Sequence, residues 1–297
     1  MSLTRRAFLG ASFASLFLNN GAQAAAGLQY IVTDSNGNVI DRKASKQKRH
    51  PASLTKMMTL YCVMAAMKDT KTDFNLDTPV EIPELINIIG DGIAVFENLK
   101  PGQKYPAGKL MTGAGSRSDA YCTLALAIHL GDKNIYNWQG TERQKLDRFL
   151  KLMNVTAAKL GMDDTHFSVC TGLPQSNHYS TPKDIAVMMR AMQENFPKSC
   201  ELAMGQPHFD LKPLSNATNH SSKILRRHGD EVMFAKTGWT NDAGYCLAVL
   251  SKIQGKEVTA VIFGADSDAH RNKVMETLLQ KARNNYIAKA APDTTPG

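Results

Sequence analysis

Apolar runs along the chain have the spacing of helices in the middle and of strands near both ends. The most apolar run follows Lys56 and is hydrophobic on nearly every side, which predicts a helix enclosed in the core. Ser53, with a proline shortly before it, stands where that helix should begin. Other runs at helical spacing predict helices over residues 120–129, 142–159, 182–193 and 271–288.

Short runs of β-branched and aromatic residues predict strands. Residues 28–34 and 39–42 flank an Asn36-Gly37 turn, which is a strong hairpin signal. Further strands are predicted over residues 79–83, 232–238, 244–251 and 257–263. With strands at both ends and helices between them, the pattern favours an α+β fold. One antiparallel sheet would draw strands from both chain ends, with an all-helical subdomain inserted.

The first 24 residues have the features of an export signal. Arg5 and Arg6 precede a short apolar run, and Ala22-Gln23-Ala24 supplies a small-x-small cleavage pattern. The arginine pair resembles a twin-arginine signal, with an ordinary Sec signal as the alternative. The mature chain is therefore expected in the periplasm. Residues 25–290 are expected to form one folded domain, and the Pro/Thr-rich residues 291–297 a disordered tail.

Composition narrows the function classes. Apolar residues make up 43% of the chain and charged residues 21%, which is ordinary for a soluble globular protein. The formal net charge of +8 favours approach to an anionic polymer, but no Lys/Arg block with interleaved aromatics indicates nucleic acid. Five cysteines are an odd number, so at least one is expected outside any intramolecular disulfide. No cysteine pair has metal-ligand spacing, and we expect no metal.

Ser53 and Lys56 have the spacing of a nucleophile and its base. On a helix these positions share a face, and a lysine kept from water can accept the serine proton. The spacing alone is weak evidence, because Ser45–Lys48 and Ser180–Lys183 repeat it without a buried helix behind them. For an isolated Ser-x-x-Lys string, helix capping is the simpler interpretation.

Further motifs supply the missing support. Ser116-Arg117-Ser118 precedes the second apolar helix, and Lys236-Thr237-Gly238 ends a strand. Thr171-Gly-Leu and Ser180-Thr-x-x-Asp lie between them. Together with Ser53-x-x-Lys56, these stretches resemble the motifs of penicillin-binding proteins and serine β-lactamases. The similarity is greatest to the low-molecular-mass D-alanyl-D-alanine carboxypeptidases, and it covers about residues 28 to 288. The resemblance implies a β-lactamase/transpeptidase-like fold.

The resemblance also implies a mechanism. Ser53 would attack the carbonyl between two terminal D-alanines of a peptidoglycan stem peptide and form an acyl-enzyme that water hydrolyses. Lys56 would act as the base, and Ser116 would relay a proton to the leaving amine. β-Lactams would acylate the same serine as inhibitors. No cofactor is implied.

The remaining motif residues are implied in substrate binding. The backbone N–H groups of Ser53 and Trp239, which follows Gly238, would form an oxyanion hole. Lys236 and Thr237 would hold the terminal carboxylate of the substrate. Arg271, after the last strand, matches a carboxylate-binding arginine of the family; a solvated charge at a helix start is the alternative.

The chain departs from the family pattern in two places. Position 118 is Ser where the family usually has Asn, so we expect weaker substrate positioning. The sequence also ends after the helix that completes the catalytic domain, without the β-rich domain and amphipathic anchor of many members. We therefore expect no stable membrane anchor.

Three other functions are alternatives to the carboxypeptidase interpretation. A class A β-lactamase would need a Glu-x-x-Leu-Asn string, which the glutamates between the second and third motifs lack. A D,D-endopeptidase that cuts peptidoglycan cross-links would use the same residues. A wall-binding protein without turnover is suggested by Ser118, but binding alone would not require a desolvated nucleophile–base pair.

Overall fold

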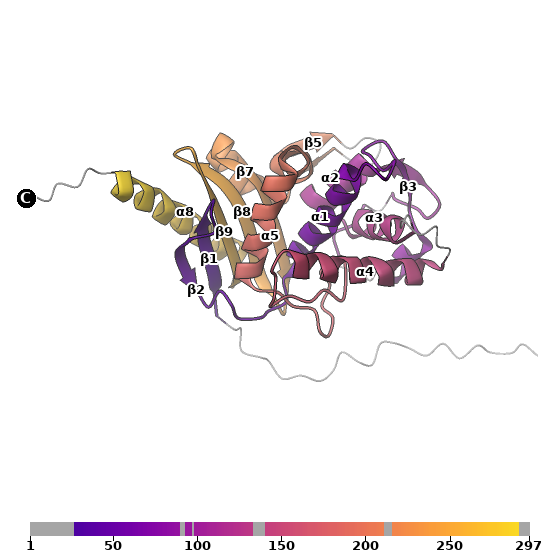
Figure 1. Cartoon of the computed structure of the whole chain (residues 1–297), viewed down its shortest axis with the longest axis horizontal. Coiled ribbons are helices and arrows are strands. Elements are labelled where there is room, and N and C mark those ends of the chain that lie inside the picture. Colours follow the sequence, from indigo (N-terminus) through magenta and orange to yellow (C-terminus); the bar gives the residue numbers. More distant parts are fainter. Residues whose placement is uncertain (1–26, 90–92, 97, 133–139, 211–215, 291–297) are drawn as a thin grey trace, which may run out of the picture.

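The computed structural model describes residues 27–89, 93–96, 98–132, 140–210 and 216–290 (Figure 1). The predicted signal, residues 1–24, and the predicted tail, residues 291–297, lie outside this part of the chain. Among the described helices, none combines the length and the hydropathy needed to cross a membrane.

A five-stranded sheet joins the two ends of the chain. Its strand order is β2-β1-β9-β8-β7, and every neighbouring pair is antiparallel. The strands are β1 Gln29–Asp34, β2 Val39–Lys43, β7 Val232–Thr240, β8 Gly244–Ile253 and β9 Lys256–Ala265. The first strand lies beside the last, with Ile31 opposite Val261. This confirms the predicted sheet of strands from both termini.

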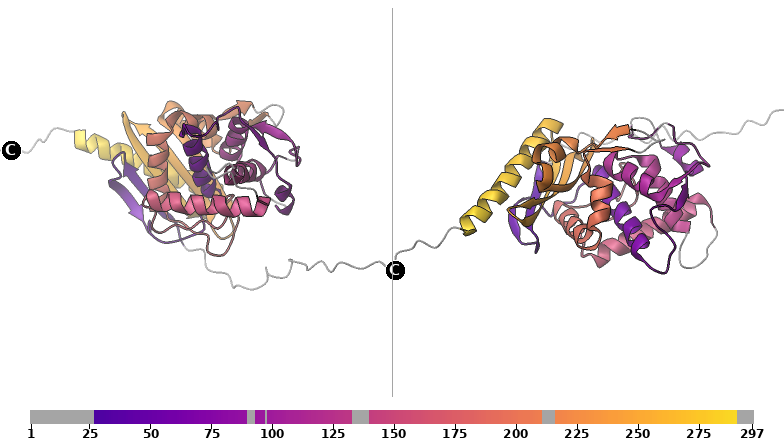
Figure 2. Two further views of the ribbon diagram at one scale, coloured as in Figure 1. Left: turned by 45° about the vertical axis from the view of Figure 1, so that its right-hand side comes forward. Right: turned by 90° about the horizontal axis from the view of Figure 1, so that it is seen from above.

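Period-two alternation gives the sheet two buried faces. Val261 and Phe263 of β9 belong to the larger core, which also contains the helix that follows Ser53. Ala260 and Ile262 belong to a second core. Helix α8, Asp268–Ala290, completes that second core, while α5, Pro182–Asn195, packs on the opposite face (Figures 1 and 2). The sheet therefore separates α8 from the helical region.

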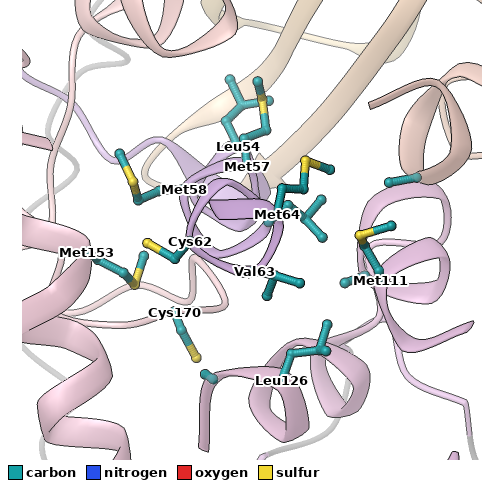
Figure 3. Packing of buried hydrophobic residues seen from close by; sticks show 14 of the residues in the cluster. Leu54, Met57, Met58, Cys62, Val63, Met64, Met111, Leu126, Met153 and Cys170 are labelled. Atoms are coloured by element: carbon teal, nitrogen blue, oxygen red, sulfur yellow. The ribbon is translucent and has the colours of Figure 1, made fainter. Parts of the chain in front are cut away.

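The helical region is built around α1, Thr55–Lys68. Figure 3 looks along this helix and shows side chains leaving it in several directions, among them Met58, Val63 and Met64. All three are buried within the larger core. The remaining long helices here are α2 Ala107–Ser116, α3 Ala120–Asp132 and α4 Glu142–Lys159. The prediction of an enclosed helix after Ser53 is confirmed.

Helix α2 was not predicted from the sequence. Gly108, Gly113 and Gly115 lower its helix propensity, since glycine in a helix interior costs about 1 kcal/mol relative to alanine. The structure gives the reason for two of them. A Cβ on Gly113 would lie 2.7 Å from Cys122 Sγ, and one on Gly115 would collide with the carbonyl oxygen of Ala203. Close packing thus requires glycine at two positions where glycine weakens the helical signal in the sequence.

Several short elements also escaped prediction, since each is too brief to show a period. Two pairs of strands form small hairpins or ribbons away from the main sheet. These elements are η3 Glu84–Ile88, β4 Lys104–Pro106, α6 Pro197–Cys200, the π-helical turn η4 Glu201–Gly205, β5 His208–Asp210, β6 Asn216–Thr218, α7 Ser222–His228 and η5 Gly229–Glu231. β4 pairs with β3, Pro79–Glu81, which was predicted.

All five cysteines are free and buried. Burial raises the pKa of the Cys62, Cys170 and Cys200 thiols to about 12. Because the thiolate is the reactive form, these side chains are chemically inert core residues.

Candidate active site

Ser53 lies in a 3-10 turn, Ala52–Leu54, that leads directly into α1. The side chains on either side, Ala52 and Leu54, are fully buried and hold the turn against the core. Lys56 is in the first turn of α1, and its Nζ donates a hydrogen bond to Ser53 Oγ over 3.1 Å. The spacing therefore brings the candidate nucleophile Ser53 and the candidate base Lys56 within hydrogen-bond distance, as the helical geometry predicts.

Lys56 is almost entirely removed from water, with 2% of its surface exposed. Its Nζ also donates to the carbonyl oxygen of Thr171 over 2.6 Å. Desolvation lowers the pKa of Lys56 to about 8, and the charge of Asp119 opposes this shift. A lysine with that pKa is partly neutral near physiological pH and can accept a proton.

Asp119 is a buried carboxylate that the sequence analysis did not single out. Its Oδ1 accepts the backbone N–H of Cys122 over 2.7 Å, so it caps the start of α3. Desolvation raises the pKa of Asp119, while hydrogen bonds and the charge of Lys56 lower it. Asp119 thus caps the start of α3 and raises the pKa of Lys56.

The loop before α5 is fastened to the first turns of α1. His178 Nε2 lies 2.9 Å from Thr55 Oγ1, and Thr59 Oγ1 donates to the carbonyl oxygen of Cys170 over 2.9 Å. Desolvation lowers the pKa of His178 to about 3, so its ring is neutral at working pH. The loop therefore packs against the start of α1 and places the Thr171 carbonyl oxygen where it accepts the hydrogen bond of Lys56.

Gly172 allows this loop to approach the Ser53 turn. It has a φ of +83°, and a Cβ there would collide with the carbonyl oxygen of Ala52. Gly172→Ala is therefore expected to destabilise the fold by about 2–4 kcal/mol through backbone strain and overlap. Thermal unfolding measures the loss. Gly161→Ala is the matched control, because Gly161 has a similar φ of +77° in open space. Equal losses in both variants would show that the approach to Ala52 contributes nothing.

Lys236 reaches the site from strand β7. Phe234 belongs to the core that contains α1, and Lys236, two residues on, shares that face. Its Nζ donates to Ser118 Oγ over 2.8 Å and to the carbonyl oxygen of Thr237 over 2.9 Å. Burial, followed by the charges of Lys56 and Arg271, lowers the pKa of Lys236 well below its usual value.

Gly238 lets β7 lie directly against the nucleophile turn. A Cβ on Gly238 would stand 3.0 Å from the backbone nitrogen of Ser53 and 3.1 Å from Ala52 Cβ. The strand backbone is thus next to the Ser53 N–H group, as an oxyanion hole shared with Trp239 would require. The Trp239 side chain is 53% exposed and lies beside Tyr245, with ring centroids 5.8 Å apart.

These elements enclose a cleft of about 790 Å³. Arg271 enters it from the first turns of α8 and forms an ion pair with Asp268. Lys236 contacts the cleft through Ser118. The predicted site residues that line it directly are Ser53, Lys56, Ser118, Thr237, Gly238, Trp239 and Arg271.

Ser116 is the predicted site residue that the structure places elsewhere. Its hydroxyl donates to the carbonyl oxygen of Ala203 over 2.8 Å and accepts from Asn219 Nδ2 over 3.3 Å. The residue is fully buried. This differs from the expected proton relay, because the hydroxyl is engaged between α2 and the π-helical turn instead of facing the cleft.

His220 lines the cleft and was not anticipated from the sequence. Desolvation and the charges of Lys236, Arg117 and Lys56 lower its pKa to about 4, so the imidazole is neutral. No local pattern around His220 indicated its position, since it follows a segment without regular periodicity.

Known proteins similar in sequence to this chain include D-alanyl-D-alanine carboxypeptidases and an endopeptidase. The sequence model of the family described as "Peptidase_S11: D-alanyl-D-alanine carboxypeptidase" matches residues 18–267. D-alanyl-D-alanine carboxypeptidase DacF of Bacillus subtilis is 28% identical over 261 residues, which are 86% of this chain and 61% of that protein. D-alanyl-D-alanine endopeptidase of Escherichia coli is 24% identical over 270 residues, 86% of this chain and 79% of that protein. The chain therefore spans about three fifths of the DacF length and more of the endopeptidase.

Solved structures share the fold. Penicillin-binding protein 6B from Escherichia coli superposes with a TM-score of 0.74 at 26% sequence identity, covering 90% of this chain and 80% of that one. The match confirms the predicted β-lactamase/transpeptidase-like architecture, in which an antiparallel sheet from both chain ends accompanies an all-helical region.

Proposed function

Because this chain belongs to the Peptidase_S11 family of D-alanyl-D-alanine carboxypeptidases, we propose that it removes the terminal D-alanine of peptidoglycan stem peptides. The observation that carries this proposal is the contact between Ser53 Oγ and the desolvated Lys56 at the floor of the cleft. A binding protein without turnover would not need a lysine whose pKa lies near 8.

The geometry supports a two-step hydrolysis. Neutral Lys56 takes the proton of Ser53 Oγ as that oxygen attacks the carbonyl carbon of the last peptide bond. The terminal D-alanine leaves, and the rest of the stem peptide stays on Ser53 as an ester. Water then hydrolyses the ester and restores Ser53. The backbone N–H groups of Ser53 and Trp239 stabilise the oxyanion in both steps.

The cationic end of the cleft suits the substrate's free carboxylate. Arg271 is a buried cation that lines the cleft together with Thr237, and the buried amine of Lys236 lies one residue before Thr237 on β7. A carboxylate placed there would be held by charge-assisted hydrogen bonds. This explains a preference for a chain terminus. β-Lactams carry a carboxylate next to a reactive amide, so they should acylate Ser53 in the same pose.

The proposed reaction takes place outside the cytoplasm, since its substrate is the cell wall and residues 1–24 have the pattern of an export signal. No cofactor takes part in the proposed steps.

A second candidate is a D,D-endopeptidase acting on peptidoglycan cross-links. The observation that favours it is the similarity to the Escherichia coli endopeptidase, of which this chain spans 79%. The same nucleophile and base would serve both reactions, and only the group beyond the scissile bond differs.

Mass spectrometry of the mature protein tests both candidates. We expect a covalent adduct after incubation with penicillin, and loss of one alanine from a pentapeptide ending in D-Ala-D-Ala. A cross-linked dimer of stem peptides is offered in parallel. Faster cleavage of the dimer than of the pentapeptide would favour the endopeptidase, and an adduct with no turnover of either peptide would refute both.

A further inference from the structure

The Ser116-Arg117-Ser118 segment presents two hydroxyl groups, and they point to different places. Ser116 Oγ is engaged with Ala203 and Asn219, whereas Ser118 Oγ accepts from Lys236 Nζ over 2.8 Å. Ser118 also lines the cleft together with Ser53 and Lys56. The hydroxyl that faces the reaction is therefore the second of the two.

The end of α2 causes this difference. The helix ends at Ser116, and Ser118 takes a left-handed conformation with φ +61°. The N–H groups of Arg117 and Asp119 both donate to the carbonyl oxygen of Gly113, each over 3.1 Å, which closes the turn around Ser118. A left-handed residue that is not glycine is uncommon and is maintained only when its surroundings fix it.

Ser116 is held away from the cleft by an equally definite set of contacts. Asn219 Nδ2, which reaches Ser116 Oγ, also donates to the carbonyl oxygens of Met204 and Gln206 over 3.2 and 2.9 Å. The backbone carbonyl of Ser116 accepts the N–H of His220 over 2.9 Å. Its hydroxyl thus belongs to a structural network that joins α2 to residues 203–206 and 219–220.

Resting on the proposed carboxypeptidase function, we propose that Ser118, and not Ser116, is the catalytic hydroxyl that protonates the leaving amine. The residue that departs from the family pattern would then supply the group that its neighbour does not bring to the cleft. Ser118 would then be a proton donor. Weaker substrate positioning would not be the main consequence of having serine instead of asparagine at position 118.

The side chains present supply a donor and an acceptor for every proton that moves in the acylation step. The C–N bond of the last peptide breaks, and its nitrogen takes the proton of Ser118 Oγ. That oxygen takes up the proton that Lys56 has received from Ser53, in the cleft that both side chains line, while Lys236 Nζ holds Ser118 Oγ in place over 2.8 Å. In deacylation, Lys56 takes a proton from the attacking water and passes it to Ser53 as the ester bond breaks. Both lysines end in their starting states.

The test compares substrates that differ only in the leaving group. One is a peptide ending in D-Ala-D-Ala, whose leaving amine must be protonated. The other is the corresponding thioester, whose thiolate leaves without a proton. The main variant is Ser118→Gly, because glycine accepts the positive φ and the substitution removes the hydroxyl together with the single carbon that carries it. Ser116→Ala is the matched control two positions away, and Ser118→Asn keeps an acceptor for Lys236 without a hydroxyl proton to transfer.

We expect Ser118→Gly and Ser118→Asn to slow peptide cleavage about 100-fold or more, and thioester cleavage less than about fivefold. Ser116→Ala should change neither rate more than about threefold. Thermal unfolding of each variant verifies that it is folded. Equal slowing of both substrates would overturn the assignment in favour of a positioning role, as would selective loss of peptide cleavage in Ser116→Ala. A wild-type protein that cleaves neither substrate would instead overturn the proposed function.

Discussion

Ser53→Ala will abolish formation of the penicillin adduct and lower release of D-alanine by about 10⁴-fold or more. The expected loss is complete because, in the described part of the chain, Ser53 Oγ is the cleft hydroxyl to which Lys56 Nζ donates. Removing a single oxygen from a turn whose flanking residues are fully buried should leave the fold intact. Intact-mass measurement after penicillin treatment gives the adduct, and amino-acid analysis of the pentapeptide reaction gives the turnover.

Ser45→Ala is the matched control for that experiment. Ser45 also precedes a lysine by three residues and is buried, but it lies in the loop after β2, where its carbonyl oxygen accepts the N–H of Lys183 over 3.0 Å. This variant should be acylated at the wild-type rate. An adduct of normal yield on Ser53→Ala would place the nucleophile elsewhere and overturn the proposed mechanism.

Lys56→Met is expected to slow acylation about 10³-fold. Methionine keeps an unbranched chain of similar length but has no amine to accept the Ser53 proton. The variant also leaves the Thr171 carbonyl oxygen without the donor it has at 2.6 Å, so a loss of about 1–3 kcal/mol in unfolding free energy should accompany it. Stopped-flow acylation with a chromogenic β-lactam measures the rate, and Lys48→Met on the exposed loop is the control.

The pH dependence of the wild-type rate identifies Lys56 as the base. Only neutral lysine can take the proton, and its pKa is about 8. Below that value the acylation rate should fall about tenfold per pH unit, and above it the rate should level off. Asp119→Asn removes a negative charge that raises the pKa of Lys56, so the whole limb should move to lower pH. An unchanged limb in Lys56→Met would assign the titration to another group.

Sequence patterns located most of the site because its parts are local. Ser53 and Lys56 share one helix start, and Lys236 to Trp239 are consecutive on one strand. For such groups, helical and strand periodicities fix which side chains share a face. The sheet from both chain ends was likewise predictable, since its strands carry strong β-branched runs.

The missed features depend on backbone conformation and on partners distant in the sequence. Ser116 and Ser118 differ by two positions, and the left-handed turn at Ser118 decides which hydroxyl enters the cleft. The Thr171 carbonyl is a backbone group, so no residue type marks it as the acceptor for Lys56. Asp119 could have been read as a helix cap, but its influence on Lys56 needs the packed core.

The pairing of β1 with β9 has a consequence for how the protein is made. On the order of 200 residues separate these neighbouring strands, so closing that loop carries a large entropic cost that only the finished sheet offsets. Non-local pairings of this kind fold slowly, and β7 takes its place at the edge of the sheet only by pairing with β8, which in turn pairs with β9. A nascent chain still on the ribosome therefore holds Ser53 and Lys56 without the strand that completes their cleft. The cleft that the proposed reaction needs is therefore complete only after synthesis has passed Arg271 in α8.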